Sequence, residues 1–441
     1  MPNLILTNAC NLSCPFCFAT ESRVDSRCSA VSRVDRTEFG RWLKWLGTDR
    51  VKLCGGEPTL HPDFIELLEM ALASGSPEIL LMTNGLWPDA VRRHIARLAP
   101  RHLVRLTILF NVLEPARYRQ VQERRLAAAL AAANPYTATI GFTIYKRPFD
   151  YRYVLELAKR TGIRHLRYSI AAPNISDPAG AIDPERDFRP LARTVVRLAG
   201  QAHRAGLALG GDCGYLPRCV YSPGDLARMQ AYPRAMQQCH RSPVDIAPGG
   251  TAWRCYGLYA VLRTTVDWSQ PPSQLDGYFD RRVRLLEDLF LFEDCRECVY
   301  LEERQCLGGC YALRVARQLR RDPATCLFPV DDDEQLLRCE PVFIGHLVGV
   351  FQLAPQKFRV VVQPERTTGR ARLELMANAG TVRLLRQEAP GRTVREWVPE
   401  LAGPFTAASN RTRAALALVR SLFDKDLLTF RRRGRGSRRR R

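Results

Sequence analysis

The sequence lacks long apolar runs and an export signal. No run of eighteen apolar residues occurs in the 441 residues, so no membrane-spanning helix is predicted. The first residues show neither a charged leader nor an apolar signal-peptide core, which argues against export and favours a cytoplasmic protein. Fifteen cysteines would suit a secreted disulfide scaffold, but such scaffolds are short. We therefore expect the cysteines of this long chain to serve as iron ligands.

A fourth ligand is missing from the cysteine group near the start of the chain. Cys10, Cys14 and Cys17 stand in the run CNLSCPFC, with three and then two residues between them. Zinc sites normally use four protein ligands, so zinc is the less favoured alternative. Three thiolates can hold a 4Fe-4S cluster and leave one iron open to a small molecule. The preceding apolar residues Leu4 to Leu6 predict a buried strand with the cysteines at its carboxyl end.

A second motif occupies residues 51–58 and reads VKLCGGEP. Its glycines allow close approach of the backbone to a ligand, and Glu57 can accept a charge-assisted hydrogen bond from an ammonium group. Together with the three cysteines, the motif resembles the radical SAM family, which uses S-adenosylmethionine (SAM). The residues that this resemblance places against the cofactor are Phe16, Gly55, Gly56, Glu57 and Pro58.

The resemblance implies the chemistry of the family. There, SAM binds the open iron of the 4Fe-4S cluster and is cleaved by an electron from the reduced cluster, and the resulting 5'-deoxyadenosyl radical abstracts a hydrogen from the substrate. It also implies a reducing partner such as flavodoxin or ferredoxin. The cofactor carries this chemistry, while the protein orients it, tunes it and excludes competing reactions.

Strand and helix patterns alternate through residues 1–205. The strand patterns are Ile79 to Met82, Leu103 to Phe110, Thr137 to Tyr145 and His165 to Ile170, with helical patterns such as Asp63 to Ser74 and Tyr118 to Ala133. Such alternation predicts an α/β fold, a parallel sheet with helices outside. The resemblance implies a partial (β/α)6 TIM-like barrel.

Polar residues at the carboxyl ends of barrel strands are further candidates for cofactor contact, because ligands of parallel barrels gather there. These candidates are Thr83, Asn84, Thr107, Arg167 and Ser169. For each of them, a structural hydrogen bond inside the barrel is an equal alternative.

Most of the remaining cysteines fall within residues 206–340. Their spacing is similar to that of the seven-cysteine SPASM domain, although the gap between Cys298 and Cys306 is seven residues, longer than is usual there. The resemblance implies one or two auxiliary 4Fe-4S clusters. The outer cluster would use Cys295, Cys298, Cys306 and Cys326, and the inner one Cys239, Cys255, Cys310 and an upstream thiol. Cys213 and Cys219 are both open for that place, of which we favour Cys219. A zinc ribbon and a single-cluster set are the alternatives, and Cys28, Cys54 and Cys339 are interpreted as structural.

A small module is predicted over residues 341–430. Phe358 to Val362 and Leu373 to Met376 have strand patterns around a turn at Thr367 to Gly369. Helical patterns cover Thr381 to Gln387, Thr393 to Leu401 and Thr412 to Phe423, and Leu427 to Phe430 suits a wing strand. The order resembles the winged-helix RiPP recognition elements, which bind leader sequences of ribosomally made precursor peptides. The resemblance implies a precursor peptide as partner, added as an extra strand.

The chain is basic, with 66 Lys and Arg against 45 Asp and Glu and a net charge of +21. Residues 431–441 read RRRGRGSRRRR, which predicts a solvated, disordered tail. Because no aromatic residues interleave with these arginines, the tail offers no stacking platform for nucleic-acid bases.

The leading hypothesis is a radical SAM/SPASM enzyme that modifies a ribosomally synthesised peptide, with a carbon–carbon or thioether crosslink as the product. A formylglycine-type protein maturase and an enzyme that oxidises a small metabolite are the enzyme alternatives. An iron–sulfur winged-helix protein that binds nucleic acid is the alternative outside enzymes.

Overall fold

The structure, a computed structural model, describes residues 2–24, 33–47, 49–171, 182, 184–214, 216–236, 242–295, 297–364, 372–402 and 406–432. Its contacts divide the chain into two compact units. The first comprises Met1–Phe279 and Phe292–Arg320, and the second comprises Asp280–Leu291 and Arg321–Arg441. No helix among the described residues combines the length and the apolar character that crossing a membrane requires.

The first unit is built on one sheet in the strand order β10-β9-β8-β1-β2-β3-β4-β5-β6-β7. The strands are β1 (Asn3–Ile5), β2 (Val51–Cys54), β3 (Ile79–Thr83), β4 (Leu106–Asn111), β5 (Ala138–Ile144), β6 (His165–Ile170), β7 (Ala208–Gly211), β8 (Val244–Ile246), β9 (Thr251–Arg254) and β10 (Arg263–Thr265). From β1 to β7 every neighbouring pair is parallel, so their carboxyl ends meet at one edge. β8 pairs in parallel with β1, and β9 and β10 extend the sheet in antiparallel fashion.

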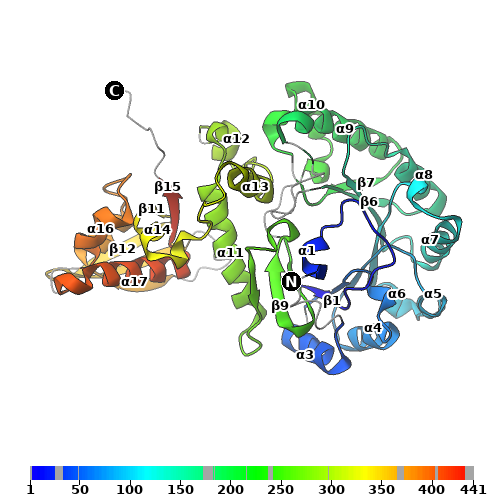
Figure 1. Cartoon of the computed structure of the whole chain (residues 1–441), viewed down its shortest axis with the longest axis horizontal. Helices are drawn as coiled ribbons and strands as arrows, with labels where there is room; N and C mark the ends of the chain where they lie inside the picture. Colours follow the sequence, from blue (N-terminus) through cyan, green and yellow to red (C-terminus); the bar gives the residue numbers. More distant parts are fainter. Residues whose placement is uncertain are drawn as a thin grey trace. The chain divides into compact units, whose positions relative to one another are not determined.

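Helices surround the curved sheet of the first unit on its outer side (Figure 1). The helices of the first unit are α1 (Thr20–Val24), α3 (Arg36–Leu46), α4 (Phe64–Ala73), α5 (Asp89–Ala96), α6 (Pro100–Leu103), α7 (Gln120–Ala132), α8 (Arg152–Thr161), α9 (Pro184–Arg204), α10 (Pro223–Met229), α12 (Val299–Glu302) and most of α13 (Tyr311–Arg321), of which α1 lies inside the curve of the sheet. α11 (Pro272–Leu289) begins in this unit and ends in the other. The expected α/β class with a partial TIM-like barrel is confirmed.

Local chemistry explains where these elements form. Asp35 caps α3 by accepting a hydrogen bond from the backbone N–H of Glu38 at 2.7 Å. The helix then buries Phe39, Trp42 and Leu46 against the sheet, as its spacing of apolar residues predicts. The strand β5 is almost wholly buried, which is the pattern of a parallel strand covered on both faces.

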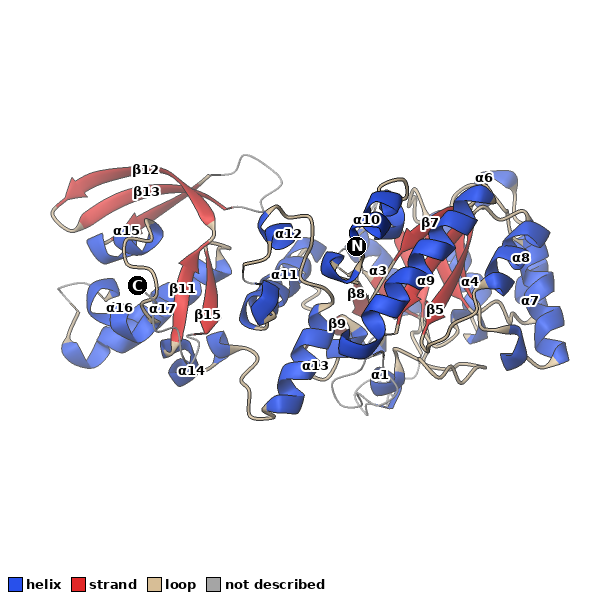
Figure 2. Cartoon of the chain, turned by 90° about the horizontal axis from the view of Figure 1, so that it is seen from above, coloured by secondary structure: helices blue, strands red, loops and turns tan. Residues whose placement is uncertain are grey.

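The second unit holds a three-stranded antiparallel sheet and a separate strand pair. The sheet has the order β12 (Gly345–Ala354), β13 (Lys357–Pro364) and β14 (Leu373–Ala377), and the pair consists of β11 (Cys339–Phe343) and β15 (Leu428–Arg432). The helices are α14 (Asp333–Leu337), α15 (Ala379–Leu385), α16 (Val394–Leu401) and α17 (Arg411–Asp424). Figure 2 shows β12 and β13 lying across α15.

The strand and helix patterns expected in this unit are all present. The expected wing strand at Leu427 to Phe430 exists as β15, but it pairs with β11 and not with the three-stranded sheet. The strand β12 was not expected from the sequence. The turn expected at residues 367–369 and the tail after residue 432 lie outside the described residues.

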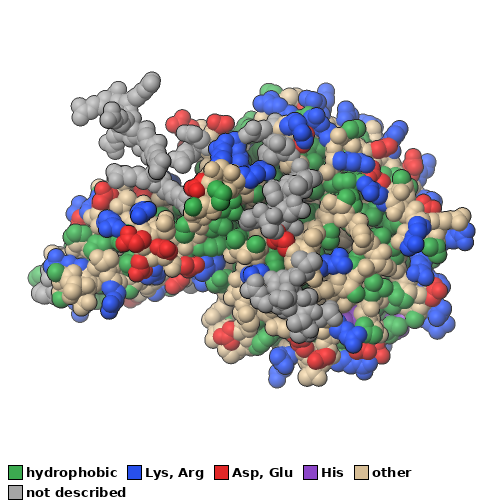
Figure 3. Space-filling view, viewed as in Figure 1, with side chains coloured by type: hydrophobic (Ala, Val, Ile, Leu, Met, Phe, Trp, Pro, Cys, Tyr) green, Lys and Arg blue, Asp and Glu red, His purple; other side chains and the backbone are tan. Residues whose placement is uncertain are grey.

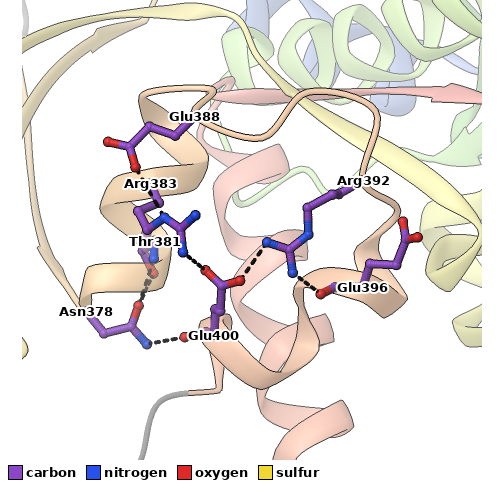
Figure 4. A network of polar contacts seen from close by, with 7 residues as sticks. All are labelled: Asn378, Thr381, Arg383, Glu388, Arg392, Glu396 and Glu400. Atoms are coloured by element: carbon purple, nitrogen blue, oxygen red, sulfur yellow. Dashed lines mark hydrogen bonds and ion pairs between the residues drawn. The ribbon is translucent and has the colours of Figure 1, made fainter. Parts of the chain in front are cut away.

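A polar network joins α15 to α16 (Figure 4). The carboxylate of Glu400 accepts a hydrogen bond from Arg383 at 2.8 Å and one from Arg392 at 2.6 Å. Asn378 caps α15 and also donates to the backbone carbonyl of Glu400 at 3.2 Å. A methyl group on Gly380 would lie 2.4 Å from that same carbonyl oxygen, so the two helices are in direct backbone contact. This packing gives the second unit its own core.

Candidate metal centre and cofactor site

The loop after β1 gathers the three predicted cluster ligands. Cys10, Cys14 and Cys17 are partly buried, and the backbone N–H of Cys17 donates to the carbonyl of Cys14 at 3.1 Å. The pKa of Cys14 is raised to about 12, first by burial and then by the nearby thiols of Cys17 and Cys10. Arg23 donates to the carbonyl of Asn8 at 3.1 Å, which places a positive charge beside this loop.

These three thiols lie on one loop and are near enough to act on one another electrostatically. Three thiolates can hold a 4Fe-4S cluster and leave one iron open, so the residues present fit such a cluster.

The GGEP loop sits directly on the start of the cysteine loop. The backbone N–H of Gly56 donates to the carbonyl of Thr7 at 2.8 Å, and that of Glu57 donates to the carbonyl of Ala9 at 2.7 Å. A methyl group on Gly55 would lie 2.4 Å from the Thr7 carbonyl oxygen, and one on Gly56 would lie 2.4 Å from the Ala9 carbonyl oxygen. Both glycines are therefore required for this contact.

Glu57 is fully buried, and four protein donors surround its carboxylate. Oε1 accepts from the backbone N–H and hydroxyl of Thr59 and from the hydroxyl of Thr83, at 3.2, 2.6 and 2.7 Å. Oε2 accepts from the backbone N–H of Asn84 at 2.7 Å. Burial raises the pKa of Glu57, whereas these hydrogen bonds act in the opposite direction. Contact of Glu57 with the methionine ammonium stays a prediction.

Thr83 is the last residue of β3, and Asn84 follows it beside the cysteine loop. The hydroxyl of Thr83 accepts from the indole N–H of Trp87 at 2.9 Å. The amide of Asn84 donates to Asn11 at 2.8 Å and approaches the sulfur of Cys10 at 3.9 Å. The structure thus brings two predicted site residues to the predicted cluster ligands.

The other predicted cofactor contacts occupy several strands. Phe16 stacks on Tyr145, which follows β5, with ring centroids 4.9 Å apart. Thr107 is the second residue of β4, opposite Leu80 of β3, so it lies near the amino end of its strand and not at the expected carboxyl end. Arg167 and Ser169 of β6 converge on the carboxylate of Asp212.

Asp212 holds both predicted β6 residues. Arg167 forms an ion pair with it at 2.5 Å, and the hydroxyl of Ser169 donates to it at 3.2 Å. Asp212 directly precedes Cys213 in the sequence. The two β6 residues therefore lie next to a candidate ligand of the inner cluster.

The candidate auxiliary thiols form two groups within the first unit. Cys213 is exposed as a residue, but surrounding protein atoms desolvate its thiol and raise its pKa. Asp212 and the thiols of Cys255 and Cys310 raise it further, so these three thiols are neighbours. The pKa of Cys219 is raised by burial first and then by the thiols of Cys306 and Cys298.

Two further contacts place Cys219 beside the second thiol group. Arg218 donates to Gln305 at 3.2 Å, and a methyl group on Gly309 would meet Pro217 at 3.5 Å. The pKa of Cys295 is raised to about 11, by burial first and then by Cys219 ahead of the other thiols.

The remaining cysteines have separate positions. Cys326 belongs to the second unit, and Cys239 and Cys28 lie outside the described residues. Cys54 and Cys339 are buried, which agrees with their structural interpretation.

Several polar groups of the site were not found from the sequence. Asn3 donates to Asp245 at 2.9 Å inside the barrel, and burial raises the pKa of this fully buried carboxyl to about 7. Lys52 lies near it, and its pKa is lowered by burial and by Arg167. The only sequence signal for this polar group was Asn3, a polar residue at the start of the otherwise apolar strand β1.

Comparison with known proteins identifies a family domain within the first unit. Residues 4–164 match the family model described as the Radical SAM superfamily. These residues therefore form a radical SAM domain, and the expected resemblance is confirmed for them.

Individual curated relatives each match a part of the chain. A "Probable GTP 3',8-cyclase" from Methanothermobacter thermautotrophicus is 29% identical over 121 residues, 27% of this chain and 38% of the relative. One from Methanopyrus kandleri is 30% identical over 125 residues, 28% of this chain and 38% of the relative. The chain thus spans less than half the length of these curated relatives.

Among solved structures, the chain is similar to SuiB from Streptococcus suis. SuiB bound to S-adenosylmethionine shares 18% identity with a TM-score of 0.47, covering 70% of this chain and 72% of SuiB. SuiB bound to precursor peptide SuiA gives a TM-score of 0.46 at 18% identity, covering 70% of this chain and 71% of SuiB.

Proposed function

We propose that the protein is a radical SAM enzyme that modifies a ribosomally synthesised precursor peptide, forming a carbon–carbon or thioether crosslink. The observation that carries the proposal is the meeting of three thiols, at Cys10, Cys14 and Cys17, with the GGEP loop at the carboxyl edge of a parallel sheet. In such a site the cluster and SAM supply a 5'-deoxyadenosyl radical when bound. The residues of the chain hold, orient and shield them.

The protein groups around that site have separate tasks. Gly55 and Gly56 keep the backbone of the GGEP loop within hydrogen-bond distance of the cysteine loop. Glu57 fixes this loop to the end of β3, where Thr83 and Asn84 lie. Glu57, Thr83 and Asn84 are buried, so water competes little for the hydrogen bonds that join them.

The auxiliary thiols support an enzyme of the SPASM type. The neighbouring thiols of Cys213, Cys255 and Cys310 are proposed to bind an inner cluster together with Cys239. This grouping favours Cys213 over Cys219 for the upstream place. Cys295, Cys298, Cys306 and Cys326 are proposed to bind an outer cluster, with Cys219 beside the first three.

The second unit supports a peptide substrate. Its three antiparallel strands followed by three helices suit a winged-helix module that binds a leader peptide as an added strand. The strand β12 is an edge of its sheet and exposes Val348, Phe351 and Leu353 by 43%, 48% and 55%. A leader strand at this edge would gain backbone hydrogen bonds and cover apolar side chains.

Other functions have weaker support. The names of the curated relatives suggest chemistry on GTP, and a small metabolite is thus a second candidate substrate, but those matches cover only 27% and 28% of this chain. Nucleic-acid binding would draw on the net charge of +21. On the face of the first unit seen in Figure 3, however, Lys and Arg alternate with Asp and Glu along the helical rim.

The test is anaerobic co-expression with a short precursor peptide encoded beside the gene, followed by mass spectrometry of the peptide. We expect a loss of two hydrogens, which is the mass change of an oxidative crosslink. The matched control replaces Cys10, Cys14 and Cys17 by alanine and should leave the peptide unchanged. An unmodified peptide beside intact protein that still forms 5'-deoxyadenosine would refute the peptide assignment.

A further inference from the structure

A closed ring of hydrogen bonds holds the side chain of Asn84 next to the cysteine loop. Its Oδ1 accepts from the backbone N–H of Leu86 at 2.9 Å. The backbone carbonyl of Leu86 accepts from the amide of Asn11 at 3.1 Å, and Oδ1 of Asn11 accepts from the amide of Asn84 at 2.8 Å. Each of the two asparagines thus fixes the other.

This ring also fixes which way the Asn84 amide faces. Its oxygen must face the N–H of Leu86, and its nitrogen must face the oxygen of Asn11. In the reverse orientation, the amide nitrogen would face the N–H of Leu86, so two donors would meet. Only one amide hydrogen is used by Asn11. The amide nitrogen lies 3.9 Å from the sulfur of Cys10, so the second hydrogen is directed to that sulfur.

The backbone of Asn84 is held as firmly as its side chain. Its N–H donates to the buried carboxylate of Glu57 at 2.7 Å, and Glu57 also accepts from Thr83. Asn84 itself is 8% exposed, so water competes little for its amide. A donor fixed by both backbone and side chain is pre-organised for the sulfur.

We propose that Asn84 is a positioning residue that donates a hydrogen bond to the Cys10 ligand and thereby raises the reduction potential of the cluster bound there. The reduced cluster carries more negative charge on its sulfurs than the oxidised cluster, so a donor at a ligand sulfur stabilises the reduced form more. Hydrogen bonds to the sulfurs are among the factors that set cluster potentials. This inference rests on the proposed function, since it requires a cluster at Cys10, Cys14 and Cys17.

The test is an anaerobic redox titration of the reconstituted protein, followed by electron paramagnetic resonance. The relevant cluster is recognised because its signal changes when SAM is added, which requires an open iron. Asn84→Leu keeps the side-chain volume and removes the donor. We expect about a tenfold fall in the ratio of reduced to oxidised cluster at a given potential, a shift of about 59 mV to more negative values.

A second variant tests whether any shift in Asn84→Leu comes from the lost donor or from a rearranged loop. Asn84→Ser keeps an oxygen that can accept from Leu86 but is too short to reach Cys10, so the same negative shift is expected. The matched control is Asn111→Leu, the same exchange at the end of the neighbouring strand β4, and it should keep the wild-type potential.

The outcomes separate this inference from the proposed function. Wild-type potentials in both Asn84 variants, with the SAM-responsive signal present, would overturn the role of Asn84 alone. A wild-type protein without any SAM-responsive cluster would overturn the proposed function. A shift of equal size in Asn111→Leu would also count against the hydrogen bond, because it would show a general effect of the exchange.

Discussion

Glu57 shows how one buried carboxylate can organise a site. An isolated buried charge is costly, so its oxygens must be matched by donors. Thr59 supplies two of these donors from the turn after the glycines, and Thr83 and Asn84 supply two from the next strand. The carboxylate thus ties two strand ends together at the edge where the thiols lie. The structural role of Glu57 is therefore to join the GGEP loop to the end of β3.

A second buried carboxyl, that of Asp245, predicts how the free energy of unfolding depends on pH. Its pKa in the folded protein is raised to about 7 from 3.8, first by burial, while Asn3 and Lys52 act in the opposite direction. The folded state therefore binds a proton more tightly than the unfolded state. The resulting stabilisation is full below about pH 4 and is lost as the pH rises to about 7.

We expect the Asp245→Asn variant not to lose this stabilisation as the pH rises, because an asparagine side chain does not titrate. Its unfolding free energy relative to the wild type should rise between about pH 4 and pH 7 by up to about 4 kcal/mol, since each pKa unit corresponds to ~1.4 kcal/mol. Chemical denaturation at several pH values measures this difference. Asp267→Asn is the control, because Asp267 is exposed and its pKa is lowered, chiefly by its hydrogen bond with Ser269. Parallel pH profiles of wild type and Asp245→Asn would contradict the argument.

Elements with a strong, regular pattern could be predicted, and those with interrupted patterns could not. The strand His165–Ile170 was predicted at its observed bounds, because the apolar residues Leu166, Tyr168 and Ile170 alternate with polar ones. The strand β12 was missed because its pairing shifts at Leu347/Gly349 and again at Gln352/Ala354, which disrupts alternation. The strand β15 was predicted, but its partner was not, since pairing with β11 joins segments far apart in the sequence.

The same distinction applies to the site. The spacing of Cys10, Cys14 and Cys17 is local, so the cysteine loop could be predicted from the sequence. The contacts of Asn84 with Asn11 and of Arg167 with Asp212 depend on which strand ends meet. Such contacts leave no local signal, and the same applies to the choice between Cys213 and Cys219.

The choice between these two thiols can be tested at the level of the cysteine-rich segments. In a background with Cys295 and Cys298 replaced by serine, the remaining auxiliary iron belongs to the inner site. We expect Cys213→Ser to remove about four iron atoms per chain from this background, the content of one 4Fe-4S cluster. Cys219→Ser should keep them, because Cys219 lies near the outer thiols.

Iron analysis and Mössbauer spectroscopy measure the outcome. Cys54→Ser serves as the control for loss of a buried thiol that belongs to neither group. Loss of the inner iron in Cys219→Ser together with its retention in Cys213→Ser would reverse the assignment.

At the scale of the whole molecule, the protein joins a radical SAM domain to a second unit with its own core. A module that binds the leader of a peptide raises the effective concentration of the rest of that peptide at the reaction site. In the proposed function, the edge strand β12 would serve this purpose. Edge strands with exposed apolar residues are prone to unwanted pairing, and a bound leader peptide would cover the exposed residues of β12.

This explanation predicts that Leu353→Glu weakens binding of the precursor peptide. Covering a leucine contributes about 1.5 kcal/mol or more, so the dissociation constant should rise about tenfold. Fluorescence anisotropy with the labelled peptide measures the constant, and iron content verifies that the variant is folded and loaded. Val121→Glu introduces the same charge at a comparably exposed position on α7 and should bind the peptide normally. Equal weakening in both variants would indicate a general charge effect, and no weakening in Leu353→Glu would place the peptide elsewhere than on the edge of β12.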